Sequence, residues 1–337
     1  MSNAIIRQHG DRPVVADNVW NIQAGAGVLA LGLLLGAGAL ALVARRTGRT
    51  AVRPPTPSGW PVAFIHRGGA AIVPEDTIPG FREGLRHGDG VVECDVHTTI
   101  DGELVVMHDE RVDRTTDGTG PVNRMSAAEV AALDAGYRFS TDGGRTFPWR
   151  DRDVRVPTLA QVYAAFPTQP VNIEIKRGGR ADIEQRVADA IAAAGAQHRT
   201  LVVSQSRATM RRFRRVSGGA VATAASRLEL LGWWLLSLVR LTWMLDPEYQ
   251  ALQPPDTFRG LRIVSPQLVR AAHRHHLRVD VWTIDEEADM RRLLGWGVDG
   301  IMTDRPDVLA RVLGQGDRAR GGDVLRTAPT VPDTHDS

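Results

Sequence analysis

The sequence predicts an α/β fold, a (β/α)8 barrel, with a single transmembrane helix before it. Short apolar runs alternate with helix-like stretches between residues 60 and 313, which indicates a parallel sheet covered by helices. The apolar runs fall within about 250 residues, the usual size of one barrel. Hydrophobic residues make up 43% of the chain and charged residues 24%, as in ordinary folded proteins.

The elements of the barrel are expected in this order. Apolar runs predict strands at residues 62–65, 91–96, 171–175, 201–204, 220–224, 250–253, 277–282 and 300–303. Helices are expected between several of them, at residues 77–87, 181–194 and 208–215. In this fold the chemistry lies at the carboxyl ends of the strands.

One apolar run, residues 104–108, breaks the alternation. It follows the second strand too closely for a parallel crossover, which needs about a dozen residues. Asp101-Gly102 lies between the two runs and favours a turn, so we expect an antiparallel hairpin that returns His108 beside Glu93 and Asp95. The polar stretch at residues 110–157 then forms an insertion before the next strand.

The chain outside the barrel domain (residues 60–313) divides into four segments. These are an N-terminal tail, a transmembrane helix, a basic and proline-rich linker, and a disordered C-terminal tail, at residues 1–21, 22–44, 45–59 and 314–337. Residues 22–44 carry no charge and are long enough to cross a bilayer. A buried core helix and a cleaved signal peptide are the alternatives.

The arginines on either side of this segment predict its orientation. Arg45, Arg46, Arg49 and Arg53 follow it, whereas only Arg7 and Arg12 precede it. Because cytoplasmic flanks carry the excess of positive charge, the barrel is expected in the cytoplasm, with the exported side as the alternative.

Charge and cysteine content exclude several other classes of protein. The net charge is only +2, and basic and acidic residues are mixed along the chain, so no nucleic acid is expected as a partner. Cys94 is the only cysteine, which excludes an intrachain disulfide and a zinc site built on several thiolates.

Two predicted strands place polar side chains on one face. Glu93 and Asp95 alternate with Cys94, and Asn172, Glu174 and Lys176 alternate with isoleucines. Two carboxylates on one face of a buried strand require a cation or bases to neutralise them; two solvated charges at a strand end are the alternative. Lys176 is the only lysine in the chain, and its compact charge suits a tight phosphate or carboxylate contact.

Two histidines complete the candidate site. His66 ends the first strand and His108 ends the hairpin, and both suit general acid and base catalysis. Arg67 suits an anionic substrate. The carboxylates of Glu93, Asp95 and Glu174 are hard ligands that favour Ca²⁺ or Mg²⁺ over zinc, and such a site suits a phosphoryl substrate.

An ordered set of motifs resembles the glycerophosphodiester phosphodiesterase family, whose barrels are related to phosphatidylinositol-specific phospholipase C. Any one of the motifs is weak, but together they cover about residues 62–310 in order. They are His66-Arg67-Gly68, Pro74-Glu75-Asp76-Thr77, Glu93-Cys94-Asp95-Val96, Asp101-Gly102, His108-Asp109, Arg114-Thr115-Thr116, Glu174-Ile175-Lys176, Trp282-Thr283, Gly297-Val298-Asp299-Gly300 and Thr303-Asp304.

The resemblance implies roles for these residues. Ca²⁺ or Mg²⁺ would bind Glu93, Asp95 and Glu174, and His66 and His108 would be the acid–base pair. Residues that line the metal and phosphate site would be Arg67, Glu75 and Lys176, with Trp282 as an aromatic wall. In the mechanism that the resemblance implies, the glycerol 2-hydroxyl attacks phosphorus and expels the alcohol, and the cyclic phosphate is hydrolysed to glycerol 3-phosphate.

Two positions depart from the pattern of this family. Asp76 and Asp285 stand where asparagine is usual. Each loses an amide donor, and Asp76 could weaken phosphate binding or alter the metal preference. Neither is an expected ligand or proton carrier, so we expect activity to persist.

The apolar segment at residues 228–245 suggests a contact with membrane lipids. Trp233, Trp234 and Trp243 lie among leucines, as in a helix at the membrane interface; a packed barrel helix or a dimer contact are the alternatives. This segment raises two further hypotheses for the protein: a lysophospholipase D on the same barrel, and a non-catalytic module that binds phosphodiesters at the membrane.

Overall fold

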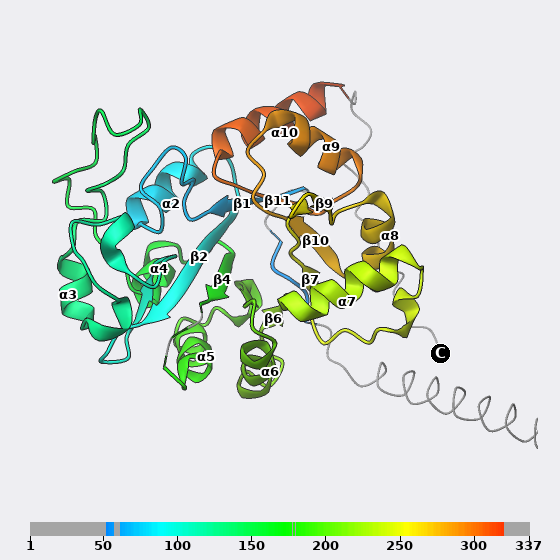
Figure 1. The fold of residues 1–337 in the computed structure, drawn as a ribbon, viewed down its shortest axis with the longest axis horizontal. Coiled ribbons are helices and arrows are strands. Elements are labelled where there is room, and N and C mark those ends of the chain that lie inside the picture. The colour runs from blue at the N-terminus through cyan, green and yellow to red at the C-terminus, as the bar shows by residue number, and fades with distance from the viewer. Residues whose placement is uncertain (1–51, 57–60, 177, 179, 320–337) are drawn as a thin grey trace, which may run out of the picture. The chain divides into compact units, whose positions relative to one another are not determined.

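A ring of eight parallel strands forms the centre of the computed structural model, which describes residues 52–56, 61–176, 178 and 180–319. The strands follow one another in the order β1-β2-β4-β5-β6-β7-β10-β11, and β11 pairs with β1. A parallel bridge between Ala224 and Ala251 joins β6 to β7 and closes the ring. The predicted parallel barrel is therefore confirmed (Figure 1).

All eight strands lie where the apolar runs predict them. Their bounds are β1 Val62–His66, β2 Val91–Thr98, β4 Val171–Ile175, β5 Thr200–Val203, β6 Ala222–Thr223, β7 Ala251–Leu252, β10 Arg278–Val281 and β11 Gly300–Thr303. Side chains of β2 are buried along its whole length, as expected where helices cover a parallel sheet.

Helices surround the strands in Figure 1. Their bounds are α2 Ile78–Leu85, α4 Leu159–Ala165, α5 Ile183–Ala193, α6 Arg207–Val216, α7 Arg227–Leu238, α8 Pro266–Arg274, α9 Glu287–Gly295 and α10 Pro306–Ala319. Many begin at a capping residue: Thr77 accepts a hydrogen bond from the Gly80 amide at the start of α2, and Thr158 and Ser226 form capping boxes at α4 and α7.

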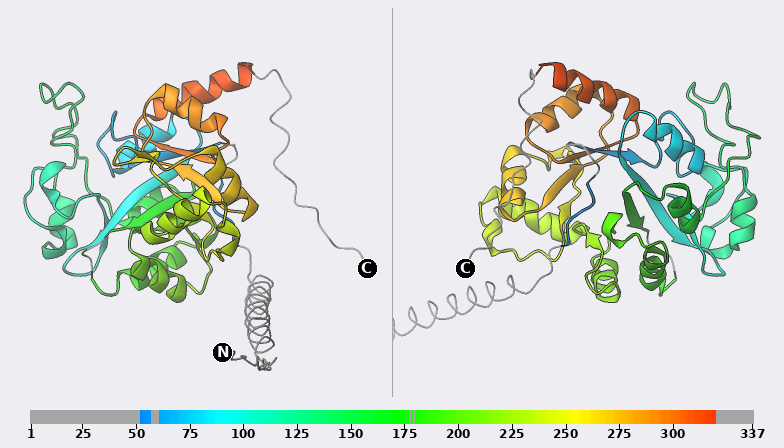
Figure 2. Two further views of the ribbon diagram at one scale, coloured as in Figure 1. Left: turned by 45° about the vertical axis from the view of Figure 1, so that its right-hand side comes forward. Right: turned by 180° about the vertical axis from the view of Figure 1, so that it is seen from behind.

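The predicted hairpin is also present. Strand β3, Leu104–Val106, runs antiparallel to β2, and the Met107 amide donates to the Asp95 carbonyl at 2.9 Å. The insertion that follows holds the short 3-10 helices Val112–Arg114 and Val122–Arg124 and helix α3, Ala127–Ala132. It lies to one side of the barrel in both views of Figure 2 and has its own small apolar core around Val112, Val130 and Val154.

Two features differ from the expectation from sequence, and one predicted segment lies outside the residues that the structure describes. A small hairpin, β8 Thr257–Phe258 with β9 Leu261–Arg262, was not expected. Helix α10 continues past residue 313 to Ala319, whereas the disordered tail was expected to begin at residue 314. The boundary was placed at the last apolar residue, and the helix does not end there. In the ranges that the structure describes, no helix is long and apolar enough to cross a membrane. The predicted transmembrane segment at residues 22–44 lies outside these ranges.

The N-terminal ends of the strands are filled by packed side chains. Phe64 packs with Val62, Val91 and Met302. Arg278 lies 5.3 Å from the Phe64 ring centroid and donates to Asp280 at 2.9 Å. Val52 packs against the cluster formed by Leu201, Ala222, Ala224 and Ala251. Because this end of the barrel is packed, the candidate site residues lie at the opposite end, where the strands have their carboxyl ends.

Candidate active site

Two adjacent strands carry the predicted carboxylates. In the register of β2 with β4, Glu93 lies opposite Asn172 and Asp95 opposite Glu174. The exposed fractions of Glu93 and Asp95 are 3% and 1%, whereas Cys94 faces the apolar core. The predicted alternation on β2 is confirmed, and the interpretation as solvated charges is wrong because both carboxylates are buried.

His66, at the end of β1, is held by a carboxylate from the opposite end of the domain sequence. Its Nδ1 lies 2.6 Å from Oδ1 of Asp304, and its Nε2 lies 3.9 Å from Glu93. Burial works to lower the pKa of His66, but the bond to Asp304 and the negative charge of Glu93 raise it above its usual value. This arrangement leaves Nε2 available for proton transfer.

His108, after β3, is held in the same way. Its Nδ1 lies 2.7 Å from Oδ1 of Asp109, and Arg114 donates to both oxygens of Asp109 at 2.7 and 3.2 Å. The hydrogen bond from Arg114, helped by the bond to His108 and opposed by burial, lowers the pKa of Asp109 to about 2. Asp109 is therefore a permanent anion behind His108.

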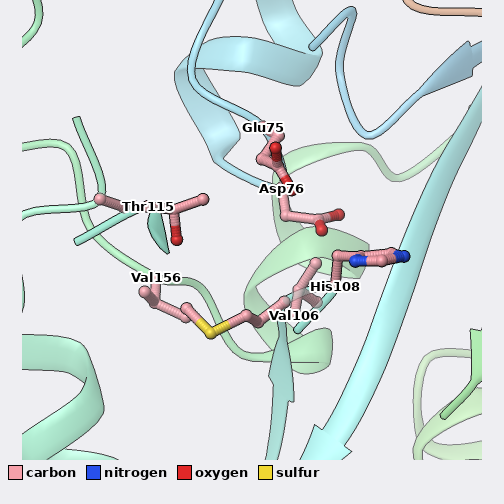
Figure 3. Close-up of a pocket in the computed structure, with 8 residues that line it drawn as sticks. Glu75, Asp76, Val106, His108, Thr115 and Val156 are labelled. Atoms are coloured by element: carbon pink, nitrogen blue, oxygen red, sulfur yellow. The ribbon is translucent and has the colours of Figure 1, made fainter. Parts of the chain in front are cut away.

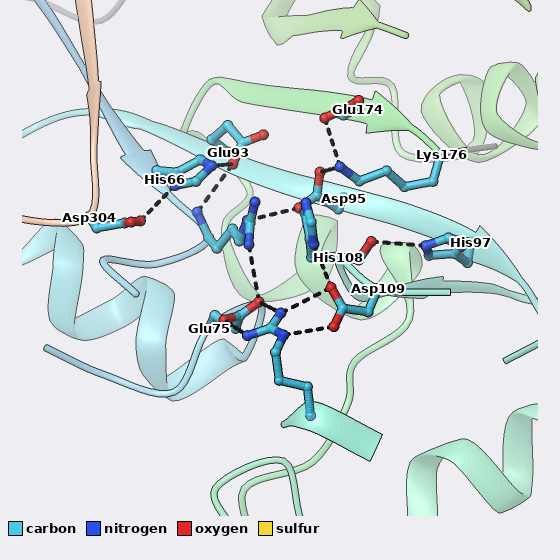
Figure 4. Close-up of polar contacts among 12 residues, drawn as sticks. His66, Glu75, Glu93, Asp95, His97, His108, Asp109, Glu174, Lys176 and Asp304 are labelled. Atoms are coloured by element: carbon cyan, nitrogen blue, oxygen red, sulfur yellow. Dashed lines mark hydrogen bonds and ion pairs between the residues drawn. The ribbon is translucent and has the colours of Figure 1, made fainter. Parts of the chain in front are cut away.

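Arg114 also connects this pair to Glu75 and Arg67, two of the residues predicted to line the phosphate site. Its two terminal nitrogens donate to the two oxygens of Glu75 at 2.7 Å each. Glu75 in turn accepts from Arg67 Nη1 at 3.3 Å, and Arg67 Nε lies 3.1 Å from Asp95. Figure 4 shows this chain of ion pairs running from His108 to Asp95.

Lys176 lies between two of the predicted metal ligands. Its Nζ is 2.8 Å from Asp95 Oδ1 and 2.8 Å from Glu174 Oε2. Burial alone would raise the pKa of Asp95, but the charges of Lys176 and Arg67 hold it below its usual value. The sequence predicts a phosphate or carboxylate contact for Lys176, and the contact in this structure is with carboxylates.

The carboxylates suit a hard divalent cation by their chemistry. Burial, followed by the charge of Asp95, raises the pKa of Glu93 to about 7, and both side-chain oxygens of Asp76 are buried without a hydrogen-bond partner in the part of the chain that the structure describes. Such oxygens gain most from a bound cation. Among the described residues, however, no group of three or more acidic, histidine or cysteine side chains is arranged to hold a metal ion.

Trp282 stands at the carboxyl end of β10. Its indole nitrogen donates to the Gln253 carbonyl at 2.6 Å, and 37% of the residue is exposed. A tryptophan fixed by its nitrogen can offer a rigid apolar face to a ligand.

Asp76, Glu75 and His108 line a small cavity with Val106, Met107, Thr115, Ala135 and Val156 (Figure 3). Its free space of about 10 Å³ is about the room of one water molecule. The carboxylate of Asp76 lies beside the His108 ring in Figure 3.

Three site residues received no role from the sequence: Asp304, Asp109 and Arg114. Each occurs in a motif of the resemblance, and Asp109 directly follows His108, which was the one local signal. Asp285 has a positioning contact: its Oδ1 accepts from the Asp304 amide at 2.8 Å and from Thr303 at 2.9 Å. In both contacts the side chain of residue 285 acts as an acceptor. An aspartate makes them as well as an asparagine would, so they do not require an amide donor.

Comparison with known proteins identifies the class of enzyme to which this barrel belongs, the phosphoric diester hydrolases. Residues 66–308 match the "Glycerophosphoryl diester phosphodiesterase family". A "Glycerophosphodiester phosphodiesterase" of Caldanaerobacter subterraneus is 32% identical over 259 residues, covering 76% of this chain and 98% of the relative. The chain therefore belongs to the glycerophosphodiester phosphodiesterase family.

Two further proteins are similar to this chain. A solved phosphodiesterase of Oleispira antarctica, in complex with the product sn-glycerol-3-phosphate, has a TM-score of 0.59 at 22% identity and covers 76% of this chain and 97% of its own. The human "Lysophospholipase D GDPD1" is 25% identical over 268 residues, covering 72% of this chain and 83% of the relative.

Proposed function

We propose that the protein hydrolyses glycerophosphodiesters to glycerol 3-phosphate and an alcohol, with a divalent cation and two catalytic histidines. The main support is the paired arrangement of His66 with Asp304 and of His108 with Asp109, at the end of the barrel that holds the buried carboxylates. Family membership supports the substrate class.

The two imidazoles carry the protons in this proposal. The glycerol 2-hydroxyl forms a bond to phosphorus, one imidazole takes its proton, and the other gives a proton to the leaving alcohol oxygen as its bond to phosphorus breaks. Water then opens the cyclic phosphate, with the two imidazoles in reversed roles. Asp304 and Asp109 hold each Nδ1, so that Nε2 exchanges the proton.

The cations of the site bind and orient the phosphate. Arg67 can contact phosphate oxygens while Glu75 fixes its guanidinium. Glu93, Asp95 and Glu174 are the residues that would hold Ca²⁺ or Mg²⁺, which would supply Lewis-acid stabilisation of the phosphoryl charge. Trp282 would pack against the glycerol.

A second candidate activity is lysophospholipase D, which would cleave the same bond in a lipid that keeps its acyl chain. The observation that favours it is the row of exposed apolar side chains on α7, described below. The similarity to a human protein of that name adds support.

The test uses the full chain in detergent. Glycerol 3-phosphate release would be measured from glycerophosphocholine and glycerophosphoethanolamine with Ca²⁺, Mg²⁺ or EDTA, and choline release from lysophosphatidylcholine beside it. The variants are His66→Ala and His108→Ala. His273→Ala is the matched control. His273 lies on α8, its Nε2 is 2.8 Å from Asp299, and it has no proposed role.

The expected result is metal-dependent release that both site variants lose and the control keeps. Release that EDTA leaves unchanged would contradict the proposed metal dependence. Unchanged release in either site variant would contradict the proposed acid–base roles of the two histidines. Faster cleavage of the lysolipid than of the glycerophosphodiesters would establish the second activity. No turnover of any diester would leave a non-catalytic binding module.

We further propose that residues 22–44 anchor the protein in a membrane as a single span, with the barrel in the cytoplasm. The support is the charge-free length of this segment and the excess of arginine after it. Deleting residues 22–44 should move the protein from the carbonate-resistant membrane fraction to the soluble fraction. Protease added to intact spheroplasts should leave the barrel intact; its digestion would place the barrel on the exported side.

Helix α7 and the residues after it offer a surface for the same bilayer. Leu228, Leu231, Leu235 and Leu238 recur on the exposed face of the helix, while Trp233 on the other face is fully buried. Val239, Leu241, Trp243 and Met244 continue the exposed surface, with Trp243 65% exposed. We propose that this surface, the α7 surface, rests on membrane lipids, because exposed leucine and tryptophan suit the interface and an apolar segment precedes the barrel in the chain.

Site-specific labelling tests this contact. Cys94 is fully buried, so a fluorophore on Leu235→Cys would report the α7 surface alone, with Asp189→Cys on the exposed side of α5 as the matched control. In lipid vesicles the label at 235 should be quenched by nitroxide lipids and protected from iodide, and the label at 189 should show the reverse. Equal iodide quenching at both positions would contradict the contact.

A further inference from the structure

Asp76 is a buried carboxylate that the proposed mechanism does not use. Only 4% of the residue is exposed, and both of its side-chain oxygens are buried without a hydrogen-bond partner among the described residues. A buried carboxylate without a partner is costly. The position therefore calls for a ligand that supplies positive charge or hydrogen-bond donors.

The backbone fixes Asp76 next to the metal-binding strand. Its amide donates to the Arg67 carbonyl at 2.8 Å, and the Arg67 amide lies 3.2 Å from Glu93 Oε2. Arg67 and Asp76 both have positive φ angles, 49° and 56°. Two such residues are held here by the surrounding structure, and aspartate tolerates this conformation better than most side chains.

The charges around Asp76 are mostly negative. It interacts electrostatically with Asp95, Glu75 and Glu93, and with the cation of Arg67. Arg67 is already shared between Glu75 and Asp95, and Lys176 is shared between Asp95 and Glu174. Arg67 therefore offsets the negative charge around Asp76 only in part.

We propose that Asp76 contributes an oxygen to the same divalent cation as Glu93, Asp95 and Glu174. This inference rests on the proposed metal dependence and adds a fourth carboxylate to its site. A site with more negative charge binds a divalent cation more tightly. The aspartate in place of the usual asparagine would then make the metal site of this chain stronger.

The competing explanation is that Asp76 is protonated and stands in for the neutral asparagine. The two explanations differ in the effect of Asp76→Asn, a change that keeps shape and removes charge. If Asp76 binds the cation, the substitution weakens metal binding and removes repulsion from the metal-free protein. If Asp76 is neutral, both properties stay as they are.

The experiment measures Ca²⁺ and Mg²⁺ binding by titration calorimetry on the full chain in detergent, after metal removal with EDTA. The variants are Asp76→Asn and Asp76→Glu, which keeps the charge. Asp280→Asn is the matched control, because Asp280 is also fully buried and has one oxygen without a partner among the described residues, but lies among the packed side chains at the N-terminal end of the barrel. Thermal unfolding of each metal-free protein is the second readout.

We expect Asp76→Asn to weaken binding of the metal by about tenfold or more and to raise the metal-free Tm, with binding unchanged in the control. Asp76→Glu should retain more of the affinity than Asp76→Asn. Equal affinity and equal metal-free Tm in wild type and Asp76→Asn would overturn the inference. Wild-type protein that binds neither metal would overturn the proposed metal dependence itself, which the calorimetry detects separately.

Discussion

The imidazole of His66 pairs through Nδ1 with the carboxylate of Asp304, at 2.6 Å, across 238 positions of sequence. Asp109 holds His108 through the same ring nitrogen at 2.7 Å. In each pair the carboxylate sets which nitrogen is free to exchange a proton, as a buried aspartate does for a catalytic histidine in hydrolases of unrelated fold. Only the first pair joins distant parts of the sequence, and it forms because β11 pairs with β1 in the closed barrel.

Removing the charge of Asp304 should slow the reaction and shift its pH dependence. In Asp304→Asn an amide oxygen can still accept from Nδ1, but the negative charge that raises the pKa of His66 is lost, so its pKa should fall. The limb of the kcat/KM profile that reports His66 should move to lower pH, and kcat should drop by about 100-fold. The pH profile with glycerophosphocholine is the measurement.

Asp299→Asn provides the control for this prediction, since Asp299 pairs with His273 at 2.8 Å outside the site. Its pH profile should match that of wild type. An Asp304→Asn profile with unchanged limbs would show that Asp304 acts only on structure.

Arg114 should be sensitive even to lysine. Its guanidinium donates to both oxygens of Glu75 and to both of Asp109, and an ammonium cannot reproduce these four planar contacts. In Arg114→Lys the carboxylate behind His108 and the one behind Arg67 both lose support. We expect kcat/KM to fall by about tenfold, or about 1.4 kcal/mol in transition-state stabilisation.

The comparison for Arg114 is Arg155→Lys in the same insertion, where a single ion pair with Asp153 at 2.7 Å is exposed. Steady-state kinetics should distinguish only Arg114→Lys from wild type. If both variants retain wild-type kinetics, the bridge between His108 and Arg67 has no catalytic importance.

The sequence predicted those parts of the site that depend on local periodicity. Glu93 and Asp95 could be assigned to one face because side chains alternate along a strand, and their burial followed from the apolar residues before them. Asp304 could not be assigned, because the closure of the barrel, not the local sequence, brings it to His66. The partner of Lys176 was also open, since a compact cation suits a phosphate and a carboxylate equally.

Short or exposed elements were harder to predict than buried strands. The β8–β9 hairpin turns at Arg259-Gly260, both with positive φ, and the glycine was its only local signal. In the segment at residues 228–245 the leucines and tryptophans look alike in sequence, yet Trp233 is buried and Trp243 is exposed. The difference arises from packing against α8, where Trp233 meets the ring of His275 at 5.0 Å between centroids.

Gly84 in α2 should not tolerate alanine. Alanine normally stabilises a helix relative to glycine, but a Cβ at this position would overlap Ile65 Cγ2 and lie 2.5 Å from the Gly68 carbonyl oxygen. Gly68 follows directly after His66-Arg67, so displacement of α2 would also disturb the site. We expect Gly84→Ala to lower stability by about 1–3 kcal/mol and to reduce activity.

Gly295→Ala at the end of α9 is the matched substitution, because a Cβ added at Gly295 would meet no atom of the described residues within 4 Å outside its own helix. Thermal unfolding should show a lower Tm for Gly84→Ala and a Tm equal to or above wild type for Gly295→Ala. A Gly84→Ala protein as stable as wild type would mean that α2 moves away from β1 at little cost.

Asp280 should make the barrel less stable as the pH rises from about 4 to about 6. Burial, opposed by the charge of Arg278, raises the pKa of Asp280 to about 6 in the folded protein, whereas an unfolded aspartate titrates near 3.9. Between these values the folded state binds more protons than the unfolded state, so the free energy of unfolding falls with pH. The difference of roughly two pKa units corresponds to roughly 3 kcal/mol, lost over this window and constant above it.

Asp280→Asn removes this titration and should remove its part of the pH dependence. The measurement is the Tm of both proteins between pH 4 and pH 8. From pH 4 to pH 6 the Tm of wild type should fall relative to the Tm of the variant. Above pH 6 the difference in Tm should stay constant, because the wild-type carboxylate is then charged in both the folded and the unfolded state. A difference that is flat over the whole range would mean that the ion pair with Arg278, at 2.9 Å, keeps Asp280 charged even at pH 4.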